Sequence, residues 1–364
     1  MAETPQSRDA VYSALPTIRV NDQEYPLVTQ LLLGMEMIEN EGGMSTLELR
    51  VSNWASNDQE GADLAFEDDR ILKLGAKIAV YAGDENAPKE IFRGTITGLE
   101  AEYPEEAPPE LVVLAEDAFQ RARMARRTKV WDKTSISDIA SQLASQLNLT
   151  PKITGLTDTI GTEVQLNESD LAFLRRLLIR HDADMQVVGS ELHVSPRKDV
   201  SRGNVELALT GQLRRARVLA DLAHQVTEVS VTGWDFKQGQ RVRVTSTGAN
   251  VQPGSGRAGA QILQDAIGAR SEHIGDAGIA DRSEAQALAD AIFDKRARPF
   301  VVVEATAEGN PALRVGTQVQ LTGLGGRFSN TYYVVRAAHK FDLNSGYRTE
   351  FAAECPFLSS GGAS

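Results

Sequence analysis

The stretch from Val164 to Met185, VQLNESDLAFLRRLLIRHDADM, places a polar cap ahead of an apolar-periodic run in an otherwise strand-rich sequence. Asn167 is predicted to cap a helix, because its side-chain oxygen can accept hydrogen bonds from unpaired backbone N–H groups. Leu171, Leu174 and Leu178 fall on one helical stripe, so we expect one buried face with the arginines of the run facing outward. Alone, this pattern indicates a core-packing amphipathic helix and no particular function.

The composition of the 364-residue chain predicts a globular protein with two or more domains, with 41% hydrophobic residues to fill their cores. A formal net charge of −12 argues against a specific nucleic-acid site, because phosphate binders need clustered excess base. We find no signal-peptide core and no apolar run long enough to cross a bilayer, so no transmembrane segment is expected. The chain is expected to be synthesised and assembled in the cytoplasm.

The first third of the chain reads as strands. Period-two alternation with short polar connections predicts strands at 17–20, 45–51, 76–81, 91–99 and 111–115. Gly94 is interpreted as a β-bulge. We expect a barrel or sandwich of roughly 100 residues here. Acidic stretches at 67–69 and 105–106 are interpreted as solvated loops, because no regular metal-ligand spacing accompanies them.

Two segments follow that first β region. The only dense basic run, RARMARRTK at 121–129, is interpreted as a helix end or linker that pairs with acidic surface in this chain or a neighbouring subunit. Residues 131–150 predict a helix capped at Thr134 or Ser135. Its apolar stripe comprises Ile136, Ile139, Leu143 and Leu147. This segment resembles the start of a LysM module, which implies carbohydrate binding or a structural insert as alternatives.

The second half of the chain returns to strands. The same alternation predicts strands at 205–209, 226–231, 240–247, 300–306, 317–321, 332–341 and 347–352. A helix is predicted at 283–296, with Ser283 and Gln286 as a capping box. These elements predict a second barrel with a helical insertion.

Gly254, Gly256 and Gly259 form a G-x-G-x-x-G pattern ahead of the helix-like stretch AQILQDAIG. A dinucleotide site needs the first glycine directly after a buried strand of a βαβ unit. Here Pro253 and polar residues intervene, and no alternating βαβα pattern surrounds the glycines. The pattern is therefore interpreted as a flexible loop, and no cofactor is expected.

Several short motifs, taken in order, resemble the tail-hub family, which comprises the phage late control gene D proteins and the N-terminal part of VgrG. They are the run from Asn167 to Leu177, the strand pair about Gly189-Ser190, Gly233-Trp234-Asp235, Asn310 to Gly316, Tyr332 to Val335, His339 and Gly346 to Thr349. The family forms the trimeric hubs of contractile tails and injection systems. The resemblance covers most of residues 17–355.

A weak internal repeat supports duplication independently of that resemblance. The stretch 74–80, LGAKIAV, parallels 315–321, VGTQVQL. Each is followed by a glycine-bearing loop, an aromatic-led strand and a strand ending in Ala-Glu, at 115–116 and 353–354. Two barrels per chain would place six in a trimeric ring, which can match a six-fold tube on one side and a three-fold spike on the other.

The sequence contains no recognisable arrangement of catalytic residues. The five histidines, His181, His193, His224, His273 and His339, form no compact metal pattern, and Cys355 has no cysteine-protease context. His339 is interpreted as a hydrogen-bonded structural histidine. We therefore assign no catalytic, cofactor-binding or metal-binding residue.

The sequence thus predicts an α+β, mainly β fold with two related β-barrel domains of the tube type and inserted α+β modules. The expected divisions are a flexible N-terminus (1–16), a first barrel (17–120), a central α+β module with the LysM-like segment (121–200), a second barrel with a helical insertion (201–355) and a flexible tail (356–364). The resemblance implies a homotrimeric baseplate hub whose partners are the inner tube or tube-initiator protein, baseplate wedge proteins and a spike. The alternative is a peptidoglycan- or carbohydrate-binding protein.

The end of the chain carries a further expectation. VgrG-type hubs continue into an OB-fold and a β-helix needle, whereas residues 356–364 are too few to form another core. The needle is therefore expected to be a separate trimeric spike protein that binds near the C-terminal tail.

Overall fold

The computed structural model describes residues 15–56, 62–84, 87–235, 238–248, 251–277, 279 and 281–359. The predicted flexible N-terminus (1–16) therefore lies almost wholly outside the described residues. The N-terminal half of the main sheet comprises β1 (Thr17–Val20), β2 (Gln23–Glu24), β3 (Leu32–Asn40), β4 (Thr46–Ser52), β7 (Lys77–Ala82), β8 (Lys89–Glu102) and β9 (Glu110–Glu116). Helix α1 (Pro26–Gln30) and the ribbon of β5 (Trp54–Ser56) and β6 (Ala62–Leu64) flank it.

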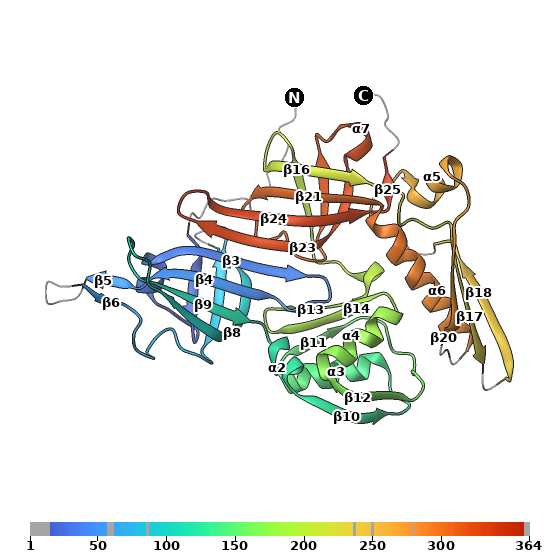
Figure 1. Ribbon diagram of the computed structural model, residues 1–364, viewed down its shortest axis with the longest axis horizontal. Coiled ribbons are helices and arrows are strands. Elements are labelled where there is room, and N and C mark those ends of the chain that lie inside the picture. The colour runs from blue at the N-terminus through green and yellow to red at the C-terminus, as the bar shows by residue number, and fades with distance from the viewer. Residues whose placement is uncertain are drawn as a thin grey trace.

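The C-terminal half of the sheet is built from strands late in the chain. They are β15 (Asn204–Ala208), β16 (Leu213–Ala220), β21 (Val301–Glu308), β22 (Gln318–Thr322), β23 (Asn330–Asp342) and β24 (Gly346–Cys355), with the short helix α7 (Gly325–Phe328). Within the described residues, both halves belong to one 13-stranded sheet, ordered β16-β21-β24-β23-β3-β4-β9-β8-β7-β1-β2, with β22 on β23 and β15 on β22 (Figure 1). The predicted mainly β fold is confirmed.

The pairing of β23 with β3 connects the two halves of the sheet, which correspond to the two related barrel domains predicted from the sequence. This pairing joins the halves directly, over Arg336–Asp342 and Gly34–Asn40. The cores are also shared, because Phe341 and Tyr347 pack into the apolar cluster of the N-terminal half. A contact between strands about 300 residues apart has no local sequence signal.

The two halves repeat the same strand order, as the sequence repeat predicted. The order β3-β4-β9-β8-β7-β1 corresponds to β16-β21-β24-β23-β22-β15. In the first half, Gly75 N–H donates to Ile96 O (2.8 Å), and Ile96 N–H donates to Ala76 O (2.9 Å). In the second, Gly316 N–H donates to Val334 O (2.9 Å), and Val334 N–H donates to Thr317 O (3.0 Å). The repeat in sequence is therefore a repeat in backbone hydrogen bonding.

Two β-bulges recur at equivalent places in the two halves. The register of β8 against β9 shifts between Ile96 and Gly98, and that of β23 against β24 shifts between Val334 and Arg336. A second shift occurs in β3 between Leu32 and Gly34, and its equivalent lies in β16 between Leu213 and Arg215. Because a bulge bends a strand and increases its twist, both halves have matching bends.

Gly94 is not at a bulge, contrary to the prediction. A Cβ atom at this position would lie 2.3 Å from the backbone oxygen of Glu116. The glycine is required because β8 and β9 approach too closely for any side chain.

The central module hangs below the sheet in Figure 1. Its elements are α2 (Phe119–Met124), β10 (Arg126–Trp131), α3 (Ile136–Leu147), β11 (Thr150–Ile153), β12 (Glu163–Ser169), α4 (Asp170–Arg180), β13 (Ala183–Val188) and β14 (Glu191–Pro196), followed by a 3₁₀ turn at Arg197–Asp199. The predicted stripes of α3 and α4 pack together in one apolar core. Leu174 is completely buried there.

The N-terminal cap was predicted correctly for α3 but not for α4. Helix α4 is capped by Ser169, whose hydroxyl accepts from Ala172 N–H (3.2 Å), while Asn167 lies in β12 with a φ of 48°. The predicted Asn167 cap is therefore wrong. Helix α3 begins as predicted, because Ser135 and Asp138 form a reciprocal capping box.

A smaller sheet backed by a helix lies at the right of Figure 1. It consists of β17 (Glu228–Asp235), β18 (Gln240–Ser246) and β20 (Ser271–Ala277), with α6 (Arg282–Ala297) packed on β17 and β18, and a 3₁₀ turn at Arg298–Phe300 follows. Asp281 caps α6 through the N–H groups of Ser283 and Glu284, so the predicted Ser283–Gln286 box is wrong. None of the helices described here is long and apolar enough to span a membrane.

The glycine-rich loop packs closely against the end of the chain. It leads through β19 (Arg257–Ala258), which pairs with β25 (Phe357–Leu358), into α5 (Gly259–Ala266). A Cβ atom at Gly256 would lie 2.2 Å from Leu358 O. The glycines therefore permit backbone contact, and the predictions of a flexible loop and of a tail flexible from residue 356 are corrected for these residues. Residues 360–364 lie outside the described part.

Candidate assembly interface

The joint between β23 and β3 is the first part of the candidate site. Seven residue pairs run antiparallel, from Arg336 opposite Asn40 to Asp342 opposite Gly34. On one face, the Lys340 ammonium lies 3.2 Å from a Glu36 carboxylate oxygen and 2.9 Å from that of Glu350. The joint therefore combines ladder hydrogen bonds with a cross-strand ion pair.

A buried ion pair fixes the end of this joint. Glu39 is fully buried, and its carboxylate accepts hydrogen bonds from Arg314 Nη2 (2.6 Å) and Nε (2.9 Å) and from Val315 N–H (2.5 Å). Because three donors satisfy the carboxylate, removing either charged partner would leave the other uncompensated away from water. This contact ties β3 to the segment that leads into β22.

His339 sits in the middle of the joint and is a structural residue, as predicted. It is fully buried, and its Nδ1 lies 2.8 Å from the Tyr347 hydroxyl and 3.3 Å from that of Thr349. Burial, and then the nearby Arg314 charge, lower the pKa of His339 to about 3. The imidazole is therefore neutral at physiological pH.

One unpaired strand segment lies on the N-terminal half. Residues Gly98–Glu102 of β8 pair with β9 on one side and with no described strand on the other; we call this segment the acidic edge. Beside it, Arg50 contacts the carboxylates of Glu102 (3.0 Å), Glu110 (2.9 Å) and Glu48 (3.4 Å). Three carboxylates share one guanidinium, so negative charge is in excess here.

A second unpaired segment lies on the C-terminal half. Residues Arg215–Ala220 of β16 pair with β21 alone among the described strands; we call this segment the basic edge. Arg217 lies 3.3 Å from Glu304, and both side chains are largely exposed. A surface cavity of about 360 Å³ beside it is lined by three arginines and two glutamates, namely Arg215, Arg217, Arg336, Glu304 and Glu350. Positive charge is in excess at this edge.

Exposed apolar side chains accompany both edges. Leu99 is 36% exposed on the acidic edge, and Tyr103, which follows it, is 65% exposed. Leu219 is 51% exposed on the basic edge. The equivalent residues in the joint are Ala337, Phe341 and Ile38, and the first two of these are buried. Both edges thus expose apolar side chains of the kind that the joint covers, and neither edge has a partner among the described strands.

A separate ionic junction holds the central module against the sheet. Arg202 pairs with the buried Asp184 (2.8 Å), Arg298 pairs with Asp182 (2.5 Å), and Arg197 pairs with Glu41. All of these residues except Arg202 line a cavity of about 270 Å³. Burial raises the pKa of Glu41. The junction fixes the module to the loop after β3.

Arg175 of α4 reaches the same loop from the module. Its Nε donates to Gly42 O (2.6 Å), and burial lowers the pKa of its guanidinium. The prediction that the arginines of α4 face outward is therefore wrong for Arg175. This side chain supplements the ionic junction with a direct hydrogen bond to the sheet.

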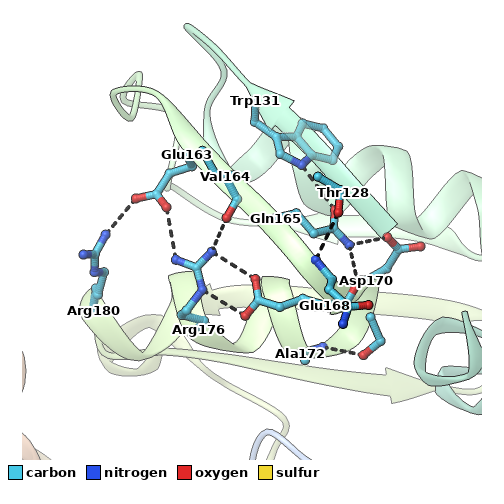
Figure 2. A network of polar contacts seen from close by, with 12 residues as sticks. Thr128, Trp131, Glu163, Val164, Gln165, Glu168, Asp170, Ala172, Arg176 and Arg180 are labelled. Carbon is cyan, nitrogen blue, oxygen red and sulfur yellow. Dashed lines mark hydrogen bonds and ion pairs between the residues drawn. The ribbon is translucent and has the colours of Figure 1, made fainter. Parts of the chain in front are cut away.

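Figure 2 shows the polar network that organises α4 and β12. Arg176 bridges Glu163 and Glu168, with contacts of 3.1 Å to each, and Arg180 reaches Glu163 at 2.7 Å. The buried Gln165 donates to Asp170 Oδ1 (3.0 Å). These contacts are internal to the module, and they position α4 against β12.

The LysM-like segment offers no accessible aromatic platform at Trp131. This side chain is 8% exposed, its ring stacks on Phe173 at 5.8 Å, and the Lys129 ammonium lies 3.3 Å from its centroid. A sugar would need an open ring face, so Trp131 does not support the carbohydrate-binding alternative. The neighbouring basic run is paired as predicted, with Arg123 on Glu116 (2.6 Å) and Arg127 on Asp170 (2.8 Å).

The residues considered for enzyme chemistry are not brought together. His181, His193 and His273 lie in different elements, and His193 contacts Glu191 while His273 contacts Ser230. Burial raises the pKa of the Cys355 thiol to about 12. Among the described residues, no group of three or more His, Cys, Asp or Glu side chains could hold a metal ion.

Comparison with known proteins shows which family this chain belongs to and which solved structures share its fold. The sequence profile of the Alg8 N-terminal domain matches residues 50–342, which span from β4 to β23. The chain belongs to the Alg8 N-terminal domain family. The family's description names no reaction or partner. No curated protein matches the sequence significantly.

Solved structures share the fold of this Alg8 N-terminal domain protein at 10–12% sequence identity. The 43 kDa tail protein of prophage MuSo2 from Shewanella oneidensis has a TM-score of 0.69, with 94% of this chain and 98% of that chain covered at 12% identity. The tail protein from Neisseria meningitidis has a TM-score of 0.66, with 93% and 96% covered at 10% identity.

A third structure links the fold to secretion machinery. It is an E. coli component of the type VI secretion system that is itself similar to the T4 bacteriophage tail proteins gp27 and gp5. Its TM-score is 0.59, with 95% of this chain and 79% of that chain covered at 10% identity. The predicted resemblance is thus confirmed for the fold: this Alg8 N-terminal domain protein has the fold of phage tail and type VI secretion proteins.

Proposed function

We propose that this chain is the structural baseplate hub of a contractile tail or contractile injection system. The observation that carries the proposal is the duplicated strand order within one sheet, with two unpaired edges that are equivalent to the two strands of the β23–β3 joint. A chain with two similar halves can present six similar surfaces when three copies surround an axis. Such a ring matches a six-fold tube on one face while keeping three-fold contacts on the other.

The fold comparisons support the same reading. The similar proteins named above are a prophage tail protein, a second tail protein and a type VI secretion component. The partners in this proposal are the inner tube or a tube-initiator protein on one face, a separate trimeric spike on the other and baseplate wedge proteins at the periphery. The role is structural, and no catalytic residue is assigned to it.

The mass and symmetry of the assembled particle test the proposal. We expect three copies of this chain around the particle axis, with an interface on the order of 2,000 Å² or more per pair, because an obligate ring must resist load. Native mass spectrometry and electron microscopy of the purified particle measure both quantities. A single copy per particle, or a particle without this chain at its axis, would overturn the proposal.

A further inference from the structure

We propose that copies of this chain join by pairing the acidic edge of one with the basic edge of the next, in the register of the β23–β3 joint. This inference rests on the proposed function and names the surface by which that ring forms. Its occupant is a second copy of the same chain. The register of this contact is taken from the β23–β3 pairing inside each chain.

The matching bulges show which residues of the two edges are equivalent to residues of the joint. They make Arg336–Asp342 of β23 equivalent to Gly98–Pro104 in and after β8. They likewise make Gly34–Asn40 of β3 equivalent to 215–221 in and after β16. In each chain, β23 and β3 meet, whereas β8 and β16 have no described partner on these sides. The unpaired segments are therefore the two sides of a second joint of the same kind.

The equivalence predicts the register between copies. Lys340 lies opposite Glu36 in the joint, so Glu102 should lie opposite Arg217 of the next copy. His339 lies opposite Met37, so Ala101 should lie opposite Val218. Pairing would also place the exposed Leu99 opposite Ala220 and the exposed Leu219 opposite Glu100, as Ala337 lies opposite Glu39 and Ala338 opposite Ile38 in the joint. The contact thereby covers apolar surface now open to solvent.

The charges at the central pair are reversed between the two joints. In the joint, the strand β23 supplies the cation Lys340 and β3 supplies the anion Glu36. Between copies, β8 would supply the anion Glu102 and β16 the cation Arg217. Arg217 would meet the site where Arg50 already faces three carboxylates. Complementary charge therefore favours this pairing.

The same reversal disfavours the wrong pairings. If the acidic edge met a copy of β3, Glu102 would face Glu36. If the basic edge met a copy of β23, Arg217 would face Lys340. Like charges directly opposite one another destabilise strand pairing. Only the acidic-to-basic contact gives opposite charges, so the halves must alternate around the ring.

Cysteine cross-linking tests the register directly in the full chain. The variant Glu102→Cys with Arg217→Cys places two thiols at positions predicted to be directly opposite, within reach of a disulfide. The native Cys355 is buried and does not interfere. Oxidation should give covalent dimers and trimers on a non-reducing gel. The matched control, Glu102→Cys with Arg215→Cys, shifts one thiol by two residues along the strand, and should not cross-link.

Charge exchange tests the ion pair. Glu102→Lys alone and Arg217→Glu alone should each raise the dissociation constant between copies at least about tenfold, because they place like charges together. The double variant should recover most of this loss. Glu67→Lys is the control, since it makes the same charge change on an exposed loop. Sedimentation equilibrium measures association, and circular dichroism checks that each variant is folded.

The outcomes separate this inference from the hub proposal. Cross-linking in the predicted register with recovery in the double charge variant supports the edge pairing. A three-fold ring whose copies neither cross-link at these positions nor respond to charge exchange overturns the edge pairing and leaves the hub role standing. A chain that is single both in solution and in the particle overturns both.

Discussion

The two halves of the sheet have the same strand order and different surroundings. Ala337, Ala338 and His339 of the C-terminal half are buried by β3, whereas the equivalent Leu99, Glu100 and Ala101 are exposed. The bulges and the glycine hydrogen bonds are the same in both halves. The difference shows that the strand geometry is determined within each half. The burial of the side chains at the edge depends on whether a neighbouring strand covers them.

The central module should be energetically separable from both halves, and Leu174→Asp tests this. A charge in its apolar core should destabilise the module by about 5 kcal/mol, because the carboxylate has no partner there. Hydrogen exchange should show lost protection in α3 and α4 with β3 and β23 still protected. An unchanged melting temperature would show that Leu174 is not in a core. Loss of protection throughout the sheet would show that module and halves unfold together.

Glu39→Ala should cost the joint about 3 to 5 kcal/mol, because Arg314 would remain buried without its partner. The equivalent residue on the basic edge is Ala220, which is exposed. Ala220→Glu, the reciprocal change, should alter stability of the separate chain by less than about 0.5 kcal/mol. Urea unfolding measures both variants. Similar effects at the two positions would remove the distinction between joint and edge.

The buried His339 should make the folded protein less stable as the pH falls. A histidine at the exposed equivalent position, Ala101, should not have this effect. The folded pKa of His339, about 3, lies below the ordinary value of 6.5, so the folded state opposes protonation. Its contribution is complete above pH 6.5 and is lost as pH falls toward 3, by about 2 kcal/mol between pH 7 and 5. Urea unfolding of His339→Gln at both pH values should lack this loss.

Two comparisons isolate the histidine effect. Burial raises the pKa of Asp117 to about 6, which stabilises the fold as pH falls through that range, so the parent and the variant must be compared at each pH. Ala101→His, at the exposed equivalent position, should add no such loss. If His339→Gln retains the full pH dependence of the parent, another group is responsible.

The smallest effect should distinguish the two repeat glycines. Gly75 and Gly316 have φ values of 82° and 87°, where a side chain is strained by about 1 kcal/mol. A Cβ atom at Gly316 would also lie 2.7 Å from Arg202 and 2.9 Å from Val200, whereas none lies within 4 Å at Gly75. Gly316→Ala should therefore cost about 1 kcal/mol more than Gly75→Ala. Equal thermal shifts would contradict this.

Most local elements could be predicted from the sequence, because their apolar residues repeat at the period of a helix or strand. The stripe of α4 and the capping box of α3 are examples. Two strands of the candidate assembly interface, β3 and β16, carry little strand signal of their own. Strand β3 reads LLGMEMIEN and β16 reads LRRARVLA, and Leu, Met, Glu, Arg and Ala are strong helix formers. Their strand state comes from long-range pairing, which no local pattern encodes.

The cap of α4 shows a smaller limit of the same kind. Asn167 and Ser169 are both good capping residues, and the sequence alone cannot place the end of β12 between them. The strand continues to Ser169 because β10 pairs with it there. The helix boundary is thus fixed by a partner strand more than 40 residues earlier in the chain.

Burial of the Glu39–Arg314 pair separates folding from association when ionic strength changes. Screening by dissolved ions acts over about 10 Å at 0.1 M salt and about 3 Å at 1 M, and it acts mainly on exposed charges. Glu39 and Arg314 are withdrawn from solvent, whereas Glu102 and Arg217 are accessible. Concentrated salt should therefore loosen copies from one another while each chain keeps its two halves together. Ionic strength should therefore control the association between copies without affecting the contact between the two halves of one chain.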